Sequence, residues 1–157
     1  MGRVLARAAF ARAARTVQRS GGRVVFTNGV FDLLHYGHVA YLERARKLGD
    51  ALFVAVNTDR STRLLKGATR PLVPQRDRMR TLAALGCVDF VTAFDEATPA
   101  ALIAQVRPDV LVKGADYRLR GIVGADAVRS WGGKVARVPL LKGRSTSALV
   151  ARIRRSR

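Results

Sequence analysis

Five short apolar runs, each followed by a segment of helical spacing, constrain the fold of this chain more than any other feature. One of them, residues 51–56 (ALFVAV), lacks the polar alternation of a half-exposed strand, so both of its faces should be buried. Alternation of strand and helix is typical of a parallel sheet with right-handed crossovers. The sequence therefore predicts an α/β fold, a Rossmann-like, doubly wound, five-stranded parallel sheet with helices on both faces, in a single domain.

The apolar spacing places the individual elements. The expected strands are residues 23–27, 51–56, 88–94, 110–113 and 135–138. The expected helices are residues 38–48, 75–85, 100–106, 125–131 and 148–154, after an N-terminal helix that ends at Gly21-Gly22. Residues 60–74 are expected to form a loop with a short helix, because Lys66-Gly67 and two prolines punctuate them.

The chain has 157 residues, of which 48% are hydrophobic, and this is enough for one core. No apolar run approaches the roughly 20 residues that a membrane helix needs, so no membrane partner is expected. Residues 1–20 are set apart as a basic N-terminal helix from the domain of residues 21–157, although their composition overlaps with that of transit peptides. The side chains expected to cover the sheet are Val4, Ala8, Phe10, Ala14 and Val17.

The formal net charge of +18 favours anionic partners. Aromatic residues make up only 6% of the chain, whereas a nucleic-acid groove would interleave them with its basic residues, so nucleic acid is not the expected partner. Cys87 is the single cysteine, which excludes an internal disulfide and is consistent with a cytoplasmic location.

Every distinctive polar cluster follows an expected strand. The clusters are residues 27–38, 57–66, 113–117 and 143–147. Ligands of open α/β sheets bind beyond the carboxyl ends of the strands, where the strand order reverses. This agreement predicts one ligand site built from all four clusters.

His35 and His38 are the only histidines, and they lie at the start of a helix that follows a strand and a turn. Free backbone N–H groups and the helix dipole make such a place an anion site, and residues three apart share one side of the helix. Gly37 between them would let a phosphate approach the backbone. For an isolated pair of this kind, ordinary capping histidines are the more common explanation. The position of this pair at the expected ligand edge favours phosphate chemistry.

The other clusters are open to two interpretations. Lys66 is either a solvated lysine or a phosphate ligand, and the hydroxyls of residues 145–147 either cap the last helix or bind phosphate. Lys113 either faces a ligand or is paired, with Asp116 as an available partner. The chain contains neither a P-loop nor a GxGxxG fingerprint, and one cysteine with two histidines argues against structural zinc.

Two of these motifs together resemble the HxGH nucleotidyltransferase superfamily of the cytidylyltransferase-like type. His35-Tyr36-Gly37-His38 matches its HxGH motif, and residues 143–147 (GRSTS) match its Gly-x-Ser-Thr-[Ser/Thr] turn. Within the superfamily, the stretches 26–50, 54–59, 65–74 and 111–117 and the pair Arg78-Met79 are most similar to the D-glycero-β-D-manno-heptose 1-phosphate adenylyltransferases, in their stand-alone form. Leu140-Leu141 stands where glycerol phosphate cytidylyltransferases carry Arg-Thr, which argues against the cytidylyl branch and leaves Lys142 or Arg144 as a substitute charge.

The resemblance implies transfer of AMP from ATP to heptose 1-phosphate, with Mg²⁺ bridged by the ATP phosphates, no protein metal ligand, a separate sugar kinase and a homodimer. It implies that His35, His38 and Lys66 are catalytic. The implied nucleotide-binding residues are Thr27, Asn28, Gly29, Phe31, Gly37, Lys113, Gly143, Arg144, Ser145 and Thr146. The implied residues for the sugar phosphate are Asp32, Asn57, Asp116 and Tyr117.

Two other functions stay open at this point. One is a glycerol-3-phosphate cytidylyltransferase or another enzyme that acts on a phosphorylated alcohol. The other is a basic module that binds nucleotide or nucleic acid without turnover, and only the net charge supports it.

Overall fold

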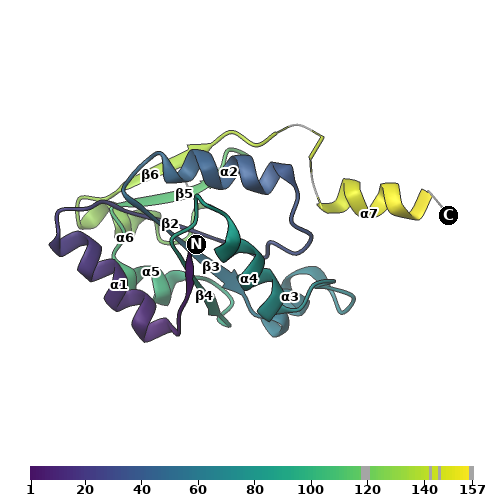
Figure 1. Cartoon of the computed structure of the whole chain (residues 1–157), viewed down its shortest axis with the longest axis horizontal. Coiled ribbons are helices and arrows are strands. Elements are labelled where there is room, and N and C mark those ends of the chain that lie inside the picture. The colour runs from purple at the N-terminus through teal and green to yellow at the C-terminus, as the bar shows by residue number, and fades with distance from the viewer. Residues whose placement is uncertain (118–120, 142, 145, 156–157) are drawn as a thin grey trace.

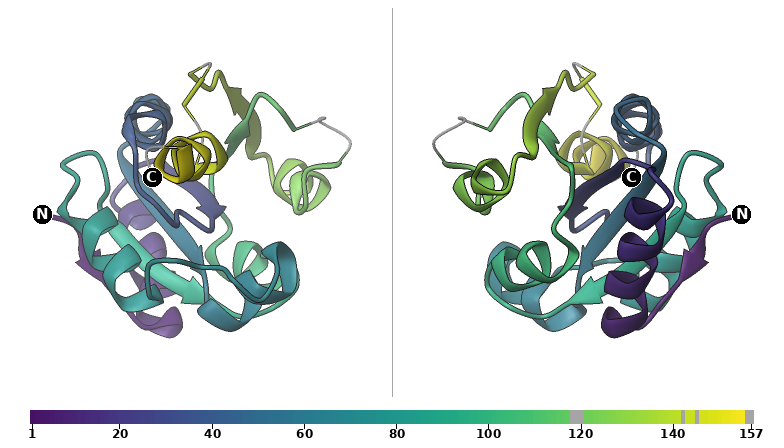
Figure 2. Two further views of the ribbon diagram at one scale, coloured as in Figure 1. Left: turned by 90° about the vertical axis from the view of Figure 1, so that its right-hand side faces the viewer. Right: turned by 90° about the vertical axis from the view of Figure 1, so that its left-hand side faces the viewer.

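The computed structural model describes residues 1–117, 121–141, 143–144 and 146–155, and it shows a parallel sheet between two layers of helices (Figures 1 and 2). The strands are β1 (Arg3–Val4), β2 (Val24–Gly29), β3 (Ala51–Asn57), β4 (Phe90–Phe94), β5 (Val110–Gly114) and β6 (Lys134–Val138). The helices are α1 (Arg7–Arg19), α2 (Tyr36–Arg46), α3 (Asp59–Lys66), α4 (Gln75–Ala84), α5 (Ala100–Val106), α6 (Ala125–Ser130) and α7 (Thr146–Arg155).

The strand order is β1-β4-β3-β2-β5-β6, and all pairs are parallel. From β2 the chain winds outward through β3 and β4, and it then returns to the other side of β2 for β5 and β6. The order therefore reverses between β2 and β5. A doubly wound sheet binds its ligands at such a reversal, so the carboxyl ends of these two strands mark the expected site.

The core lies on both faces of the sheet, as the uninterrupted apolar run of β3 predicted. Leu52, Val54 and Val56 pack on the face covered by α2 and α4, whereas Ala51, Phe53 and Ala55 pack on the face covered by α1, α5 and α6. Successive side chains of a strand point to opposite faces, so a strand buried on both sides must be apolar throughout.

The N-terminal segment adds both an edge strand and a helix to the sheet. Phe10 and Ala14 of α1 are fully buried, and Phe10 meets Phe53 edge to face at 5.0 Å between ring centroids. The sheet has six strands where five were expected, because Arg3–Val4 pairs with β4. The expectation that Val4 and Ala8 cover the sheet was wrong, since Val4 lies in this edge strand with its side chain exposed and Ala8 is on the exposed side of α1.

Other differences from the expected elements are small. Residues 59–66 form a full helix, α3, because the Thr58 hydroxyl accepts a hydrogen bond from the Ser61 N–H at 3.0 Å and caps its first turn. Helix α2 begins at Tyr36 rather than at residue 38, and α7 begins at Thr146 rather than at residue 148. Strand β4 begins at Phe90 rather than at residue 88.

Helix α7 extends away from the rest of the molecule, and it has no buried residue (Figure 1). In the described part of the chain, no helix is both long enough and apolar enough to cross a membrane.

Candidate active site

Two adjoining cavities of about 540 and 370 Å³ open at the carboxyl ends of β2, β3 and β5. Nine residues line both of them: Asn28, Gly29, Val30, Phe31, His38, Lys66, Lys113, Tyr117 and Thr146. Asp32 and Asn57 line only the larger cavity, and His35, Gly37, Asp116 and Arg144 line only the smaller one. The sheet thus brings together residues from all four polar clusters, as their positions after the strands predicted.

The two histidines lie against one another at the start of α2. Their rings stack with centroids 3.9 Å apart at an interplanar angle of 23°. Both ring nitrogens of His35 and the Nδ1 atom of His38 are buried and have no hydrogen-bond partner among the described residues. His35 occupies the N-cap position of α2 without a side-chain capping bond. Buried polar atoms usually have partners, so these ring nitrogens are candidates for hydrogen bonds to a ligand.

Burial lowers the pKa of His38 to about 4, and the neighbouring His35 adds to the shift. The pKa of His35 is also lowered, first by burial and then by the positive charge of Arg144. Both imidazoles are therefore neutral at pH 7 in the free protein, and each presents an N–H donor. A phosphate placed beside them would favour their charged forms and raise both pKa values.

The depressed pKa of His38 makes the stability of the fold depend on pH. The unfolded chain takes up a proton near pH 6.5, whereas the folded chain resists protonation of this ring down to about pH 4. The contribution of the neutral His38 ring to the unfolding free energy is present above pH 6.5 and is lost as the pH falls toward 4. We expect the unfolding free energy of wild type to fall by about 2 kcal/mol more than that of His38→Gln between pH 7 and pH 4.5. Urea titrations of both proteins measure this difference, and parallel pH profiles would contradict it.

Phe31, in the loop between β2 and α2, has an unusual backbone conformation. Its φ of 50° is in the left-handed region, where large side chains are rare. Its ring meets the His38 ring at 5.4 Å between centroids with an angle of 64°. Strained residues of this kind gather at functional sites, and here the strain places an aromatic ring against the histidine.

Lys113 at the end of β5 turns toward β2. Its Nζ donates to Oδ1 of Asn28 at 2.6 Å, and it lies 5.4 Å from the centroid of the Tyr117 ring. Burial lowers its pKa to about 8, against the opposing effect of Asp116. The partner of Lys113 is thus Asn28 of β2, the strand on the other side of the point where the strand order reverses. The ammonium group of Lys113 places a positive charge in the wall that both cavities share.

Two of the expected site residues that the structure describes, Thr27 and Gly143, line neither cavity. Thr27 is fully buried behind the cavities, where its hydroxyl is 2.7 Å from that of Tyr41. Gly143 has a φ of 70° in the turn before α7 and lines neither cavity. Ser145 and Lys142 lie outside the described residues.

Asp32 lines the larger cavity, but its carboxylate is engaged by the protein. Its Oδ1 atom accepts the N–H groups of Leu72 and Val73, both at 2.8 Å, and its Oδ2 atom pairs with Nη2 of Arg70 at 2.6 Å. Only 1% of its side chain is exposed. In this arrangement Asp32 fastens the loop of residues 67–74 to the β2–α2 loop, whereas the sequence suggested that it faces the sugar phosphate.

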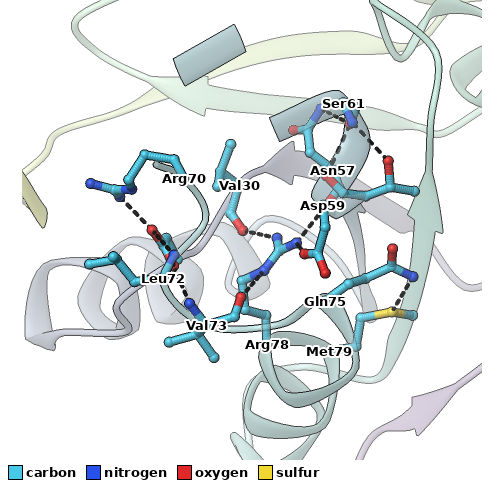
Figure 3. Close-up of polar contacts among 12 residues, drawn as sticks. Val30, Asn57, Asp59, Ser61, Arg70, Leu72, Val73, Gln75, Arg78 and Met79 are labelled. Carbon is cyan, nitrogen blue, oxygen red and sulfur yellow. Dashed lines mark hydrogen bonds and ion pairs between the residues drawn. The ribbon is translucent and has the colours of Figure 1, made fainter. Parts of the chain in front are cut away.

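Arg78 of α4 is a central residue that the motifs did not assign to the site (Figure 3). Its guanidinium is buried and donates to the backbone oxygens of Val73, Val30 and Asn57, and it pairs with Asp59 at 2.7 Å. One side chain thus joins the β2–α2 loop, which leads to the histidines, to the start of α3, which carries Lys66, and to the loop that carries Arg70. A sequence signal existed, because position 78 lies on the same helical face as Leu82 and Leu85.

No group of three or more His, Cys, Asp or Glu side chains lies together as a metal site in the part of the chain that the structure describes. The carboxylate of Asp32 already accepts three donors at the larger cavity. A metal ion here would therefore depend on oxygens of the ligand, such as those of a polyphosphate.

Comparison with known proteins agrees with this geometry. The model of the family described as cytidylyltransferase-like matches residues 26–142. The bifunctional protein HldE of Magnetococcus marinus is 59% identical over 133 residues, which are 85% of this chain and 27% of that protein. The protein of the same name from Geotalea uraniireducens is 52% identical over 93% of this chain and 30% of its own length. The chain thus spans less than a third of these curated relatives.

Two solved structures are similar to this chain. The lipopolysaccharide core biosynthesis protein from Thermoplasma volcanium has a TM-score of 0.64 and 31% identity, covering 78% of this chain and 98% of its own. The pantoate-β-alanine ligase from Francisella tularensis, solved with an ATP analogue and β-alanine, has a TM-score of 0.64 at 15% identity, which shows a shared fold alone. The family model over residues 26–142, together with the HxGH histidines in their cavity, shows that the chain belongs to the cytidylyltransferase-like family of nucleotidyltransferases.

Proposed function

We propose that this chain transfers AMP from ATP to D-glycero-β-D-manno-heptose 1-phosphate and releases pyrophosphate. The observation that carries the proposal is the stacked pair His35 and His38 at the start of α2, of which three buried ring nitrogens have no hydrogen-bond partner among the described residues. Lys66 and Lys113 line the cavities beside them. Nucleotidyl transfer needs such donors, placed in advance where charge develops on phosphate oxygens.

The choice of acceptor has independent support. The Thermoplasma volcanium neighbour is titled a lipopolysaccharide core biosynthesis protein, and residues 111–117 (LVKGADY) resemble the heptose branch. Leu140 and Leu141, which replace the Arg-Thr of glycerol phosphate cytidylyltransferases, line the smaller cavity. These features favour adenylyl transfer to a sugar phosphate over cytidylyl transfer to glycerol 3-phosphate.

The proposed reaction is an in-line displacement. An oxygen of the acceptor phosphate attacks the α-phosphorus of ATP, a new P–O bond forms, and the bond from the α-phosphorus to the bridging oxygen of pyrophosphate breaks. His35 and His38 donate hydrogen bonds to the transferring phosphoryl group, and Lys66 stabilises the leaving pyrophosphate. Mg²⁺ bound to the ATP phosphates would neutralise part of their charge. The proposal also includes a separate sugar kinase, a homodimer and a cytoplasmic location, which remain predictions from the sequence.

A pyrophosphate-release assay tests the proposal. ATP with heptose 1-phosphate should give turnover, whereas CTP or GTP with the same sugar, and CTP with glycerol 3-phosphate, should give rates at least tenfold lower. Turnover only with CTP and glycerol 3-phosphate would replace the substrate assignment. Salt-dependent binding of DNA without pyrophosphate release from any pair would favour the binding module instead.

The same assay tests whether turnover depends on the absence of a side chain at Gly37. A Cβ atom at this position would lie 2.9 Å from Cε1 and Nδ1 of His35 and 3.0 Å from Cβ of Arg144. We expect Gly37→Ala to lower turnover at least tenfold, because the His35 ring must move, while alanine stabilises the α2 helix itself by up to about 1 kcal/mol. Thermal unfolding separates the two effects, and an unchanged rate would show that the ring position is not critical.

A further inference from the structure

We propose that Arg70 is a phosphate-binding residue of the larger cavity. Arg70 lies in the loop of residues 67–74 and lines this cavity together with Lys66. Neither the motifs nor the comparisons assign it a role. The inference rests on the proposed function in one respect, since that function supplies two phosphate-bearing ligands for the cavity.

An ion pair within the protein holds the guanidinium of Arg70 in place. Its Nη2 atom pairs with Asp32 at 2.6 Å, and only 22% of its side chain is exposed. Asp32 is itself held by the N–H groups of Leu72 and Val73, so the pair cannot turn without breaking the loop. A planar guanidinium that is held in this way loses little conformational freedom when it binds an oxyanion.

Arg70 also retains a donor for which none of the described residues supplies an acceptor. Five side-chain nitrogen and oxygen atoms in the described part of the chain are buried without a hydrogen-bond partner, and four of them belong to His35, His38 and Arg70. The atom of Arg70 is Nε. A buried N–H group without an acceptor destabilises the folded protein, and a hydrogen bond to an anion in the cavity would remove this penalty. The unused donors therefore mark the residues at which a ligand should place its oxygens.

The chemistry of these donors selects a phosphoryl group. Arg70 and Lys66 together present two cations to one cavity, and the Asp32 carboxylate beside them is already engaged. Arginine donates to phosphate oxygens with strong, directed hydrogen bonds. The phosphate comes either from the terminal phosphates of the nucleotide or from the sugar phosphate, and the two sources are separated by the experiment.

Isothermal titration of the whole protein with three probes tests the proposal: inorganic pyrophosphate, ATP and heptose 1-phosphate. Arg70→Ala should weaken at least one of them by roughly 10- to 100-fold, as expected for lost charge-assisted hydrogen bonds. The matched control is Arg76→Ala, which removes the same charge from an exposed position in α4 and should change no affinity more than about twofold. A loss with pyrophosphate and ATP assigns Arg70 to the nucleotide, and a loss with the sugar phosphate alone assigns it to the acceptor.

Equal affinities in Arg70→Ala and Arg76→Ala for all three probes would overturn the proposal. Arg70→Lys covers the case in which the alanine variant does not fold, because it keeps the ion pair with Asp32 but has no N–H at the Nε position. It should bind the affected probe at least about fivefold more weakly than wild type, and wild-type affinity would also overturn the proposal. Pyrophosphate binding needs no turnover, so a failure of the heptose assignment leaves this result intact.

Discussion

Replacing His38 with alanine lowers the rate of pyrophosphate release by roughly 100- to 1,000-fold at saturating substrates, which is the usual loss when one transition-state donor is removed. The reason is that His38 lines both cavities and its buried Nδ1 atom has no hydrogen-bond partner in the described part of the chain, so this ring can serve the ligand. The fold should persist, since alanine relieves the burial of a polar ring and suits the first turn of α2. Initial rates as a function of ATP and acceptor concentration measure the change.

Tyr36→Phe is the matched control for this experiment. Tyr36 belongs to the same helical turn and is exposed, and it lines neither cavity, so its variant should retain the wild-type rate within about twofold. Near-normal turnover in His38→Ala would remove this histidine from the mechanism. A rate lost together with thermal stability would instead indicate a structural histidine.

Replacing Arg78 with methionine should destabilise the protein by about 3–5 kcal/mol, the range measured when one partner of a buried ion pair is removed. Arg78 is 1% exposed, and its departure leaves the Asp59 carboxylate and the backbone oxygens of Val30, Val73 and Asn57 without their donor. Methionine fills a similar volume, so the loss reports the polar contacts rather than a cavity. In a chain of this size the midpoint of thermal unfolding should fall by roughly 10 °C.

Arg80→Met provides the comparison for this prediction, since Arg80 lies on the exposed side of the same helix. Its unfolding free energy should stay within about 0.5 kcal/mol of the wild-type value. Urea titrations followed by circular dichroism give both numbers. Equal values for the two variants would show that the contacts of Arg78 add no net stability.

Most of the fold was predictable because each central strand carries its own signal. The run of β3 is apolar on both faces, and it was placed to within a residue. Strand β1 was missed because two residues cannot show a period, and its pairing depends on the open edge of β4, which is a tertiary contact. Helix α3 was expected as a loop with a short helix because Gly67 and the prolines dominate that stretch, although Thr58 offered a capping signal.

The candidate site was predictable to the extent that strand ends define it. His35, His38, Lys66 and Lys113 meet there because parallel strands deliver their carboxyl ends to one edge. The partners of Asp32 and Arg78 were not predictable, since each contacts segments that are distant in sequence. A carboxylate after a strand looks the same in a sequence whether it faces a substrate or holds a loop.

The parallel pairing of β1 also determines where an attachment to this protein would interfere least. Met1 precedes β1, so it lies at the amino ends of the strands, opposite the cavities, and its side chain is fully exposed. An affinity tag or a fluorescent label joined there leaves the ligand edge open. The other terminus follows α7, whose first residues, Thr146 and Ser147, form part of the cavity wall. A fluorescent label on α7 should therefore respond to ligand binding, whereas an affinity tag at Met1 would serve to immobilise the protein.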